Sequence, residues 1–87
     1  SQNYPNPFNP RTTIEFSLPK RSTVKITVLN LLGQTIETLL AEDLPAGVHR
    51  TTWDGVRFPS GIYLYRLQIY GSSTSIFMET KKMLLVR

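Results

Sequence analysis

The side chains of this chain that could do chemistry are few, and they do not form a complete set. His49 is the only imidazole, cysteine is absent, and Glu42 and Asp43 are the one pair of adjacent carboxylates. Acid–base or nucleophilic catalysis needs groups that act together, and a zinc site needs several His, Cys or acidic ligands. Neither a Gly-x-Ser-x-Gly elbow nor a glycine-rich phosphate loop accompanies His49. The sequence therefore predicts no enzyme, no metal and no other cofactor.

Each of these residues also has a structural explanation. The Asp54–Gly55 pair is a typical turn signal, and the Glu42–Asp43 pair lies in a segment that we expect to be a solvated loop. His49 alternates with Trp53, which predicts a strand residue at the rim of the core. We therefore interpret all of them as parts of the fold.

The charge pattern does not favour nucleic acid as a partner. Ten basic and six acidic residues give a formal net charge of +4, but only Lys20–Arg21 and Lys81–Lys82 are adjacent bases. A nucleic-acid surface is normally denser and interleaved with stacking aromatic residues. No apolar run approaches the roughly 20 residues that cross a bilayer, so we expect no membrane-spanning segment.

The elements that must position these residues begin with an extended leading segment. Residues 1–10 contain three prolines, which exclude a helix or a central strand. Tyr4 and Phe8 are large apolar anchors, so this segment is predicted to pack against the domain that follows, residues 11–87. A length of 87 residues fits one small domain of this kind.

Alternation of apolar and polar residues dominates the rest of the chain. It predicts strands over residues 12–18, 24–28, 35–40, 48–53, 62–70 and 74–87, the last either continuous or divided near residues 79–82. Residues 41–47 are predicted to be a loop, and a short helix competes only over residues 31–40. About seven short strands separated by proline and glycine turns indicate an all-β antiparallel sandwich. The expected core comprises Phe8, Ile14, Phe16, Leu18, Val24, Ile26, Val28, Ile36, Trp53, Tyr63, Tyr65, Leu67, Met83 and Leu85.

Six segments, in order along the chain, together resemble one known family. They are residues 3–14 (NYPNPFNPRTTI), 31–34 (LLGQ), 44–49 (LPAGVH), 53–55 (WDG), 59–67 (PSGIYLYRL) and 81–87 (KKMLLVR). The set resembles the C-terminal sorting domain, type A, of the bacterial type IX secretion system. It covers nearly the whole chain without a large gap.

The resemblance implies a fold and a role. The fold is an immunoglobulin-like β-sandwich, related to that of the flagellar hook-cap protein. In the family this domain follows a secreted cargo in the same polypeptide and addresses it to the outer-membrane translocon. A sortase-like protease commonly removes the domain and can link the cargo to lipopolysaccharide. The resemblance thus implies export through the periplasm to the cell surface or the medium.

The same resemblance implies a set of recognition residues, each with a physical reason. Prolines keep the leading segment extended, glycines give turns their freedom of φ, and the tail combines apolar and charged residues that a receptor can read. The set is Pro5, Asn6, Pro7, Phe8, Gly47, Gly61, Tyr63, Lys81, Lys82, Met83, Leu85 and Arg87.

Two other classes of function remain open at this point. The first is a structural or carbohydrate-binding immunoglobulin-like accessory module of a secreted hydrolase, for which Tyr63, Tyr65 and Tyr70 are the clustered aromatic candidates. The second is a scaffold role in assembly, like that of the flagellar hook-cap domain. For the tail, the competing explanation is purely structural, with Met83 and Leu85 in the core and Lys81 and Lys82 guarding an edge strand.

Overall fold

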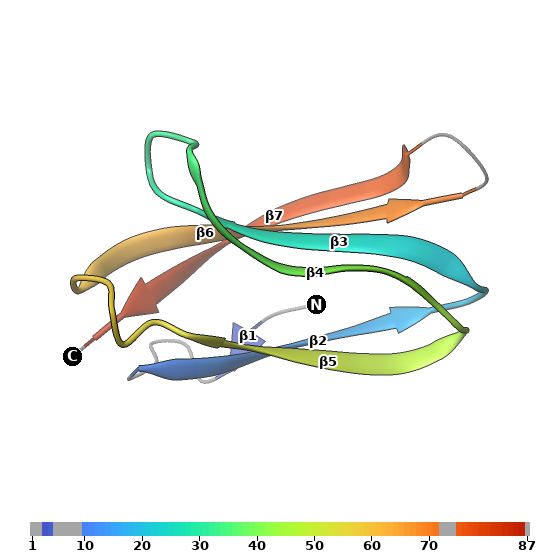
Figure 1. Cartoon of the computed structure of the whole chain (residues 1–87), viewed down its shortest axis with the longest axis horizontal. Coiled ribbons are helices and arrows are strands. Elements are labelled where there is room, and N and C mark those ends of the chain that lie inside the picture. The colour runs from blue at the N-terminus through green and yellow to red at the C-terminus, as the bar shows by residue number, and fades with distance from the viewer. Residues whose placement is uncertain (1–2, 5–9, 72–74, 87) are drawn as a thin grey trace.

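The chain forms two antiparallel β-sheets packed as a sandwich (Figure 1). The computed structural model describes residues 3–4, 10–71 and 75–86, and this part contains no helix. Its strands are β1 (Asn3–Tyr4), β2 (Arg11–Leu18), β3 (Ser22–Leu29), β4 (Thr35–Leu44), β5 (Gly47–Asp54), β6 (Gly61–Tyr70) and β7 (Ser75–Leu85). The all-β prediction is confirmed.

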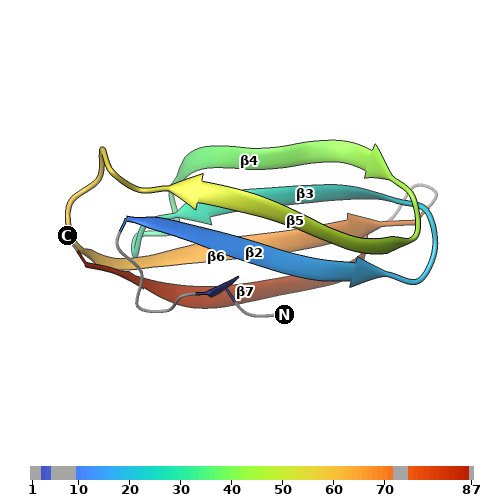
Figure 2. The ribbon, with the colours of Figure 1, turned by 90° about the horizontal axis from the view of Figure 1, so that it is seen from below.

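The order of the strands is that of an immunoglobulin-like sandwich. One sheet has the order β1-β2-β5 and the other β4-β3-β6-β7. Figure 2, turned from the first view, shows β2 and β5 lying across the layer that contains β3, β6 and β7. β2 pairs with β5, β3 with β6, and β6 with β7, which corresponds to the B–E and C–F–G pairings of immunoglobulin domains.

The alternation seen in the sequence produces the core. On β2, Ile14, Phe16 and Leu18 are buried, while the residues between them face outward. The core residues found in the described part are Ile14, Phe16, Leu18, Val24, Ile26, Val28, Leu29, Trp53, Tyr63, Tyr65, Leu67, Ile69, Met83 and Leu85. Sequence reasoning missed Leu29 and Ile69. Ile36, expected in the core, packs against it but is only partly buried, and Phe8 lies outside the described residues.

The predicted loop over residues 41–47 is wrong, because β4 continues to Leu44. Asp43 and Glu42 pair with Thr23 and Val24, so only Pro45 and Ala46 remain between β4 and β5. Since β4 is the outermost strand of its sheet, polar side chains there can stay in solvent without breaking the ladder. The final strand is continuous from Ser75 to Leu85 rather than divided.

Candidate functional site

The structure brings together part of the predicted recognition set where β6 begins and β7 ends. Gly61 pairs with Leu85, and Tyr63 pairs with Met83. Both apolar tail residues are fully inside, with Met83 1% and Leu85 0% exposed. The last strand is therefore an integral part of the core and not an appended tag.

Tyr63 fixes the loop that leads into β6. Its hydroxyl donates a hydrogen bond to the carbonyl of Pro59 at 2.7 Å, and its ring packs edge-on against Trp53 with 5.4 Å between centroids. The indole Nε1 of Trp53 in turn donates to Glu37 Oε1 at 3.0 Å. The aromatic ring is thus buried with its polar atoms satisfied, as an internal tyrosine requires.

Leu85 closes the core at this end of the sandwich. Its side chain lies 3.1 Å from the point that a Cβ on Gly55 would occupy, so a side chain at Gly55 would require Leu85 to shift by a few tenths of an ångström. The amide of Gly55 donates to the carbonyl of Pro10 at 2.9 Å, which fastens the start of β2 to the same place. Leu85 therefore packs where the beginning of the domain and its last strand meet.

The adjacent lysines of the tail point to opposite faces of their sheet. Lys81 lies opposite buried Tyr65, on the inner side, and its Nζ is 3.6 Å from Glu79 Oε2. Lys82 lies opposite Leu64 and is exposed on the outer face. A single receptor surface that lies on the outer face of the sheet would meet Lys82 directly and Lys81 only at the strand edge.

Gly47 lies at the other end of the sandwich from Gly61. It starts β5, whose far end, Asp54, pairs with Arg11. Its φ of +129° requires glycine, although a Cβ there would meet nothing within 4 Å. Gly47 therefore serves the short turn between β4 and β5, at the opposite end of the sandwich from the Gly61–Leu85 pair.

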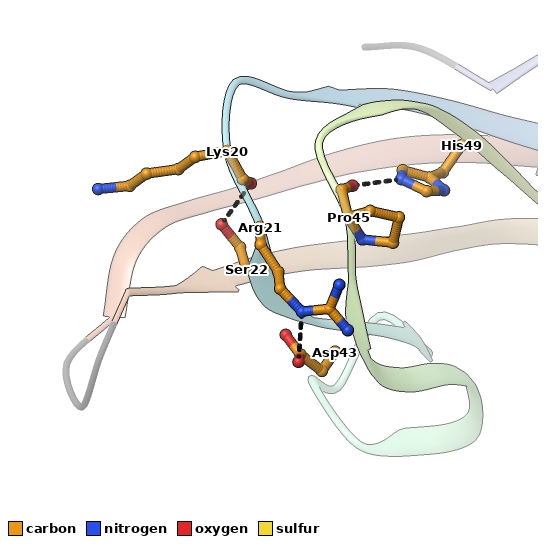
Figure 3. Close-up of polar contacts among 6 residues, drawn as sticks. All are labelled: Lys20, Arg21, Ser22, Asp43, Pro45 and His49. Carbon is orange, nitrogen blue, oxygen red and sulfur yellow. Dashed lines mark hydrogen bonds and ion pairs between the residues drawn. The ribbon is translucent and has the colours of Figure 1, made fainter.

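Polar contacts of three residues hold this end of the molecule (Figure 3), one of them a hydrogen bond of 3.0 Å from the Ser22 hydroxyl to the carbonyl of Lys20. The ring of His49 donates from Nε2 to the carbonyl of Pro45 at 2.8 Å and stacks on Phe16. Nearby, Arg21 Nε donates to Asp43 Oδ2 at 2.9 Å, which ties the β2–β3 turn to the end of β4. The lone histidine and one carboxylate of the Glu42–Asp43 pair thus both have structural contacts.

The remaining predicted recognition residues, Pro5, Asn6, Pro7, Phe8 and Arg87, lie outside the described residues. Within residues 3–4, 10–71 and 75–86, no group of three or more His, Cys, Asp or Glu side chains could hold a metal ion. The same part of the chain has no helix that is long and apolar enough to span a membrane.

A cavity of about 430 Å³ opens between β2 and β7. Apolar side chains dominate its wall, among them Phe16, Leu67, Ile69 and Phe77, with Lys20 and Glu79 among the charged residues that line it. Glu79 is already engaged by Lys81.

The proposed aromatic platform for sugar binding does not form. Tyr63 and Tyr65 are 7% and 0% exposed, which leaves Tyr70 as the partly exposed member of the three. Stacking on a sugar needs exposed, coplanar rings, so the carbohydrate-binding version of the accessory-module hypothesis loses its candidate residues.

Apart from Lys82, the predicted recognition set contains no residue on the outward side of the four-stranded sheet among those described. Ile62 and Leu84 lie directly opposite each other and are 43% and 42% exposed. Lys25 and Arg66 share this face, because each alternates with buried neighbours on β3 and β6. The period-two pattern places these residues on the outward side of their strands, but their neighbours across the strands depend on the register.

A scan against family models matched residues 2–83 to the model described as "Secretion system C-terminal sorting domain". The search of curated proteins and the search of solved structures gave no match. The matched range contains six complete strands and most of the seventh, so the similarity extends over the sandwich as a whole.

Proposed function

The chain belongs to the family of secretion system C-terminal sorting domains, and from this premise we propose that it carries a larger cargo through the type IX outer-membrane translocon. The family assignment implies a sorting signal and export toward the cell surface or the extracellular space. The finer steps proposed here are recognition of the folded domain at the translocon, passage through the periplasm, and removal of the domain by a sortase-like protease. The observation that carries the proposal is the family match over residues 2–83.

The terminal strand is the part of the domain that we expect the translocon to read. β7 is the last strand in the order of its sheet, so its outer side is not paired with another strand of the described part. Such an edge can accept a strand from a receptor through backbone hydrogen bonds, while side chains supply specificity. Lys82 on the outer face and Lys81 at the edge give this strand positive charge.

The leading segment has a separate role in this proposal. Pro5 and Pro7 favour an extended backbone between cargo and domain, and an extended stretch is what a protease needs at a junction. We therefore place the cleavage region in or before residues 1–10.

The function is tested by fusing residues 1–87 behind a periplasm-directed reporter in a host that has this export route. We expect the reporter at the cell surface or in the medium, separated from the domain. Retention of the intact fusion in the periplasm would contradict the proposal and would favour a purely structural module.

The role of the tail lysines is tested by Lys81→Gln/Lys82→Gln in the same fusion. The matched control is Lys20→Gln/Arg21→Gln, the other adjacent basic pair of the chain. We expect the tail variant to lose most of its surface reporter and the control to keep it, with similar melting temperatures for both domains. Unchanged export of a folded tail variant would remove these lysines from the mechanism.

A further inference from the structure

Three cations form a line across the outer face of the four-stranded sheet. Lys25, Arg66 and Lys82 come from β3, β6 and β7, and each points away from the core. Lys25 lies opposite Gln68, and Arg66 lies opposite Thr80, so each cation is displaced by two residues from the next. Diagonal neighbours of this kind are about 7–8 Å apart. We call Lys25, Arg66 and Lys82 the cationic diagonal.

The sheet itself does not neutralise Lys25 or Arg66. Within the described part of the chain, Lys25 forms no ion pair, and Arg66 Nε donates to the neutral hydroxyl of Thr80 at 3.4 Å. Asp43 is an acid on the same face, but its carboxylate is already bound by Arg21. Two positive charges therefore remain on this face without a described carboxylate partner, and they repel each other at diagonal spacing.

Apolar side chains lie on both sides of the cationic diagonal. Met78, 60% exposed, lies opposite Gln68 on one side, and the exposed pair of Ile62 and Leu84 lies on the other. The positive charges of Lys25 and Arg66, between exposed apolar side chains, suit a partner that is acidic and also buries apolar area.

We propose that the cationic diagonal is a docking surface for an acidic strip on a protein of the export machinery. The inference rests on the proposed export function and names the chemistry of the receptor. Alternate residues of a strand are about 7 Å apart, so carboxylates on one face of a receptor strand match the spacing of the diagonal. A protein is favoured over a lipid surface, because membrane-binding clusters usually contain about four to eight basic residues.

The test uses Lys25→Gln/Arg66→Gln in the reporter fusion, because both residues lie outside the tail. The matched control is Arg11→Gln/Arg50→Gln, which removes the same charge from the outer face of the other sheet. We expect about a tenfold loss of surface reporter for the first variant and none for the control. Lys25→Glu/Arg66→Glu should reduce export further. The melting temperature of each variant domain, compared with that of the unaltered domain, checks that all of them are folded.

The outcomes separate this inference from the proposed function. If the unaltered fusion reaches the cell surface and the folded Lys25→Gln/Arg66→Gln variant is exported equally well, the docking surface is wrong and the sorting function stands. Retention of the unaltered fusion in the periplasm overturns both. The purified chain could instead bind phosphatidylglycerol vesicles but not phosphatidylcholine vesicles, and lose this binding in the double variant. That result would identify a lipid partner and overturn the proposal of an acidic protein partner.

Discussion

The outer faces of the two sheets differ in whether their basic residues have an acidic residue across the strands. On the three-stranded sheet, Arg50 lies opposite Glu15 with 2.7 Å between their charged atoms, and Arg11 lies opposite Asp54 at 3.3 Å. On the four-stranded sheet, Lys25 and Arg66 have no such acid across the strands. Exposed ion pairs contribute only about 0–1 kcal/mol, so the pairing is not what holds the sandwich together. The two faces differ instead in the electrostatic potential that each presents to a partner.

Both outer faces depend on the one core that lies between the sheets, so the largest loss of stability is expected from a change in that core. Leu85→Ala should lower the free energy of unfolding by about 2–5 kcal/mol, because a fully buried side chain is replaced by a cavity. Leu84→Ala, on the outer side of the same strand, should cost less than about 1 kcal/mol. Urea unfolding of both variants measures the difference. Equal losses would contradict the assignment of an inner and an outer side to β7.

The next effect concerns the backbone at the start of one strand in each sheet. Gly47 begins β5 and Gly61 begins β6, with φ of +129° and +153° and no atom within 4 Å of either added Cβ. Gly47→Ala and Gly61→Ala should therefore each cost about 1–3 kcal/mol through strain alone. Urea unfolding of the two variants gives the comparison. A loss at one glycine and none at the other would show that the turns are not equivalent.

The sequence predicted the sandwich because alternation alone separates Phe16 and Tyr65, which face the core, from Glu15 and Arg66, which face outward. It failed at Glu42–Asp43, where polar residues resemble a loop although an outermost strand tolerates them. The arrangement of the tail was harder to predict. That Gly61 meets Leu85 follows from the β6–β7 register, which residue types alone do not give, whereas the divergence of Lys81 and Lys82 follows from the alternation of side chains along any strand.

The smallest effect tests the charge comparison directly. A double-mutant cycle on Glu15 and Arg50 should give a coupling energy of about 0.2–1 kcal/mol, because both side chains are partly exposed. Lys25→Gln should change stability by less than about 0.5 kcal/mol, since no described carboxylate loses a partner. Urea unfolding at low and high salt measures both, and salt should weaken the Glu15–Arg50 coupling. A larger loss for Lys25→Gln would mean that its charge stabilises the fold, and the cationic diagonal would then have a structural purpose like that of the paired face.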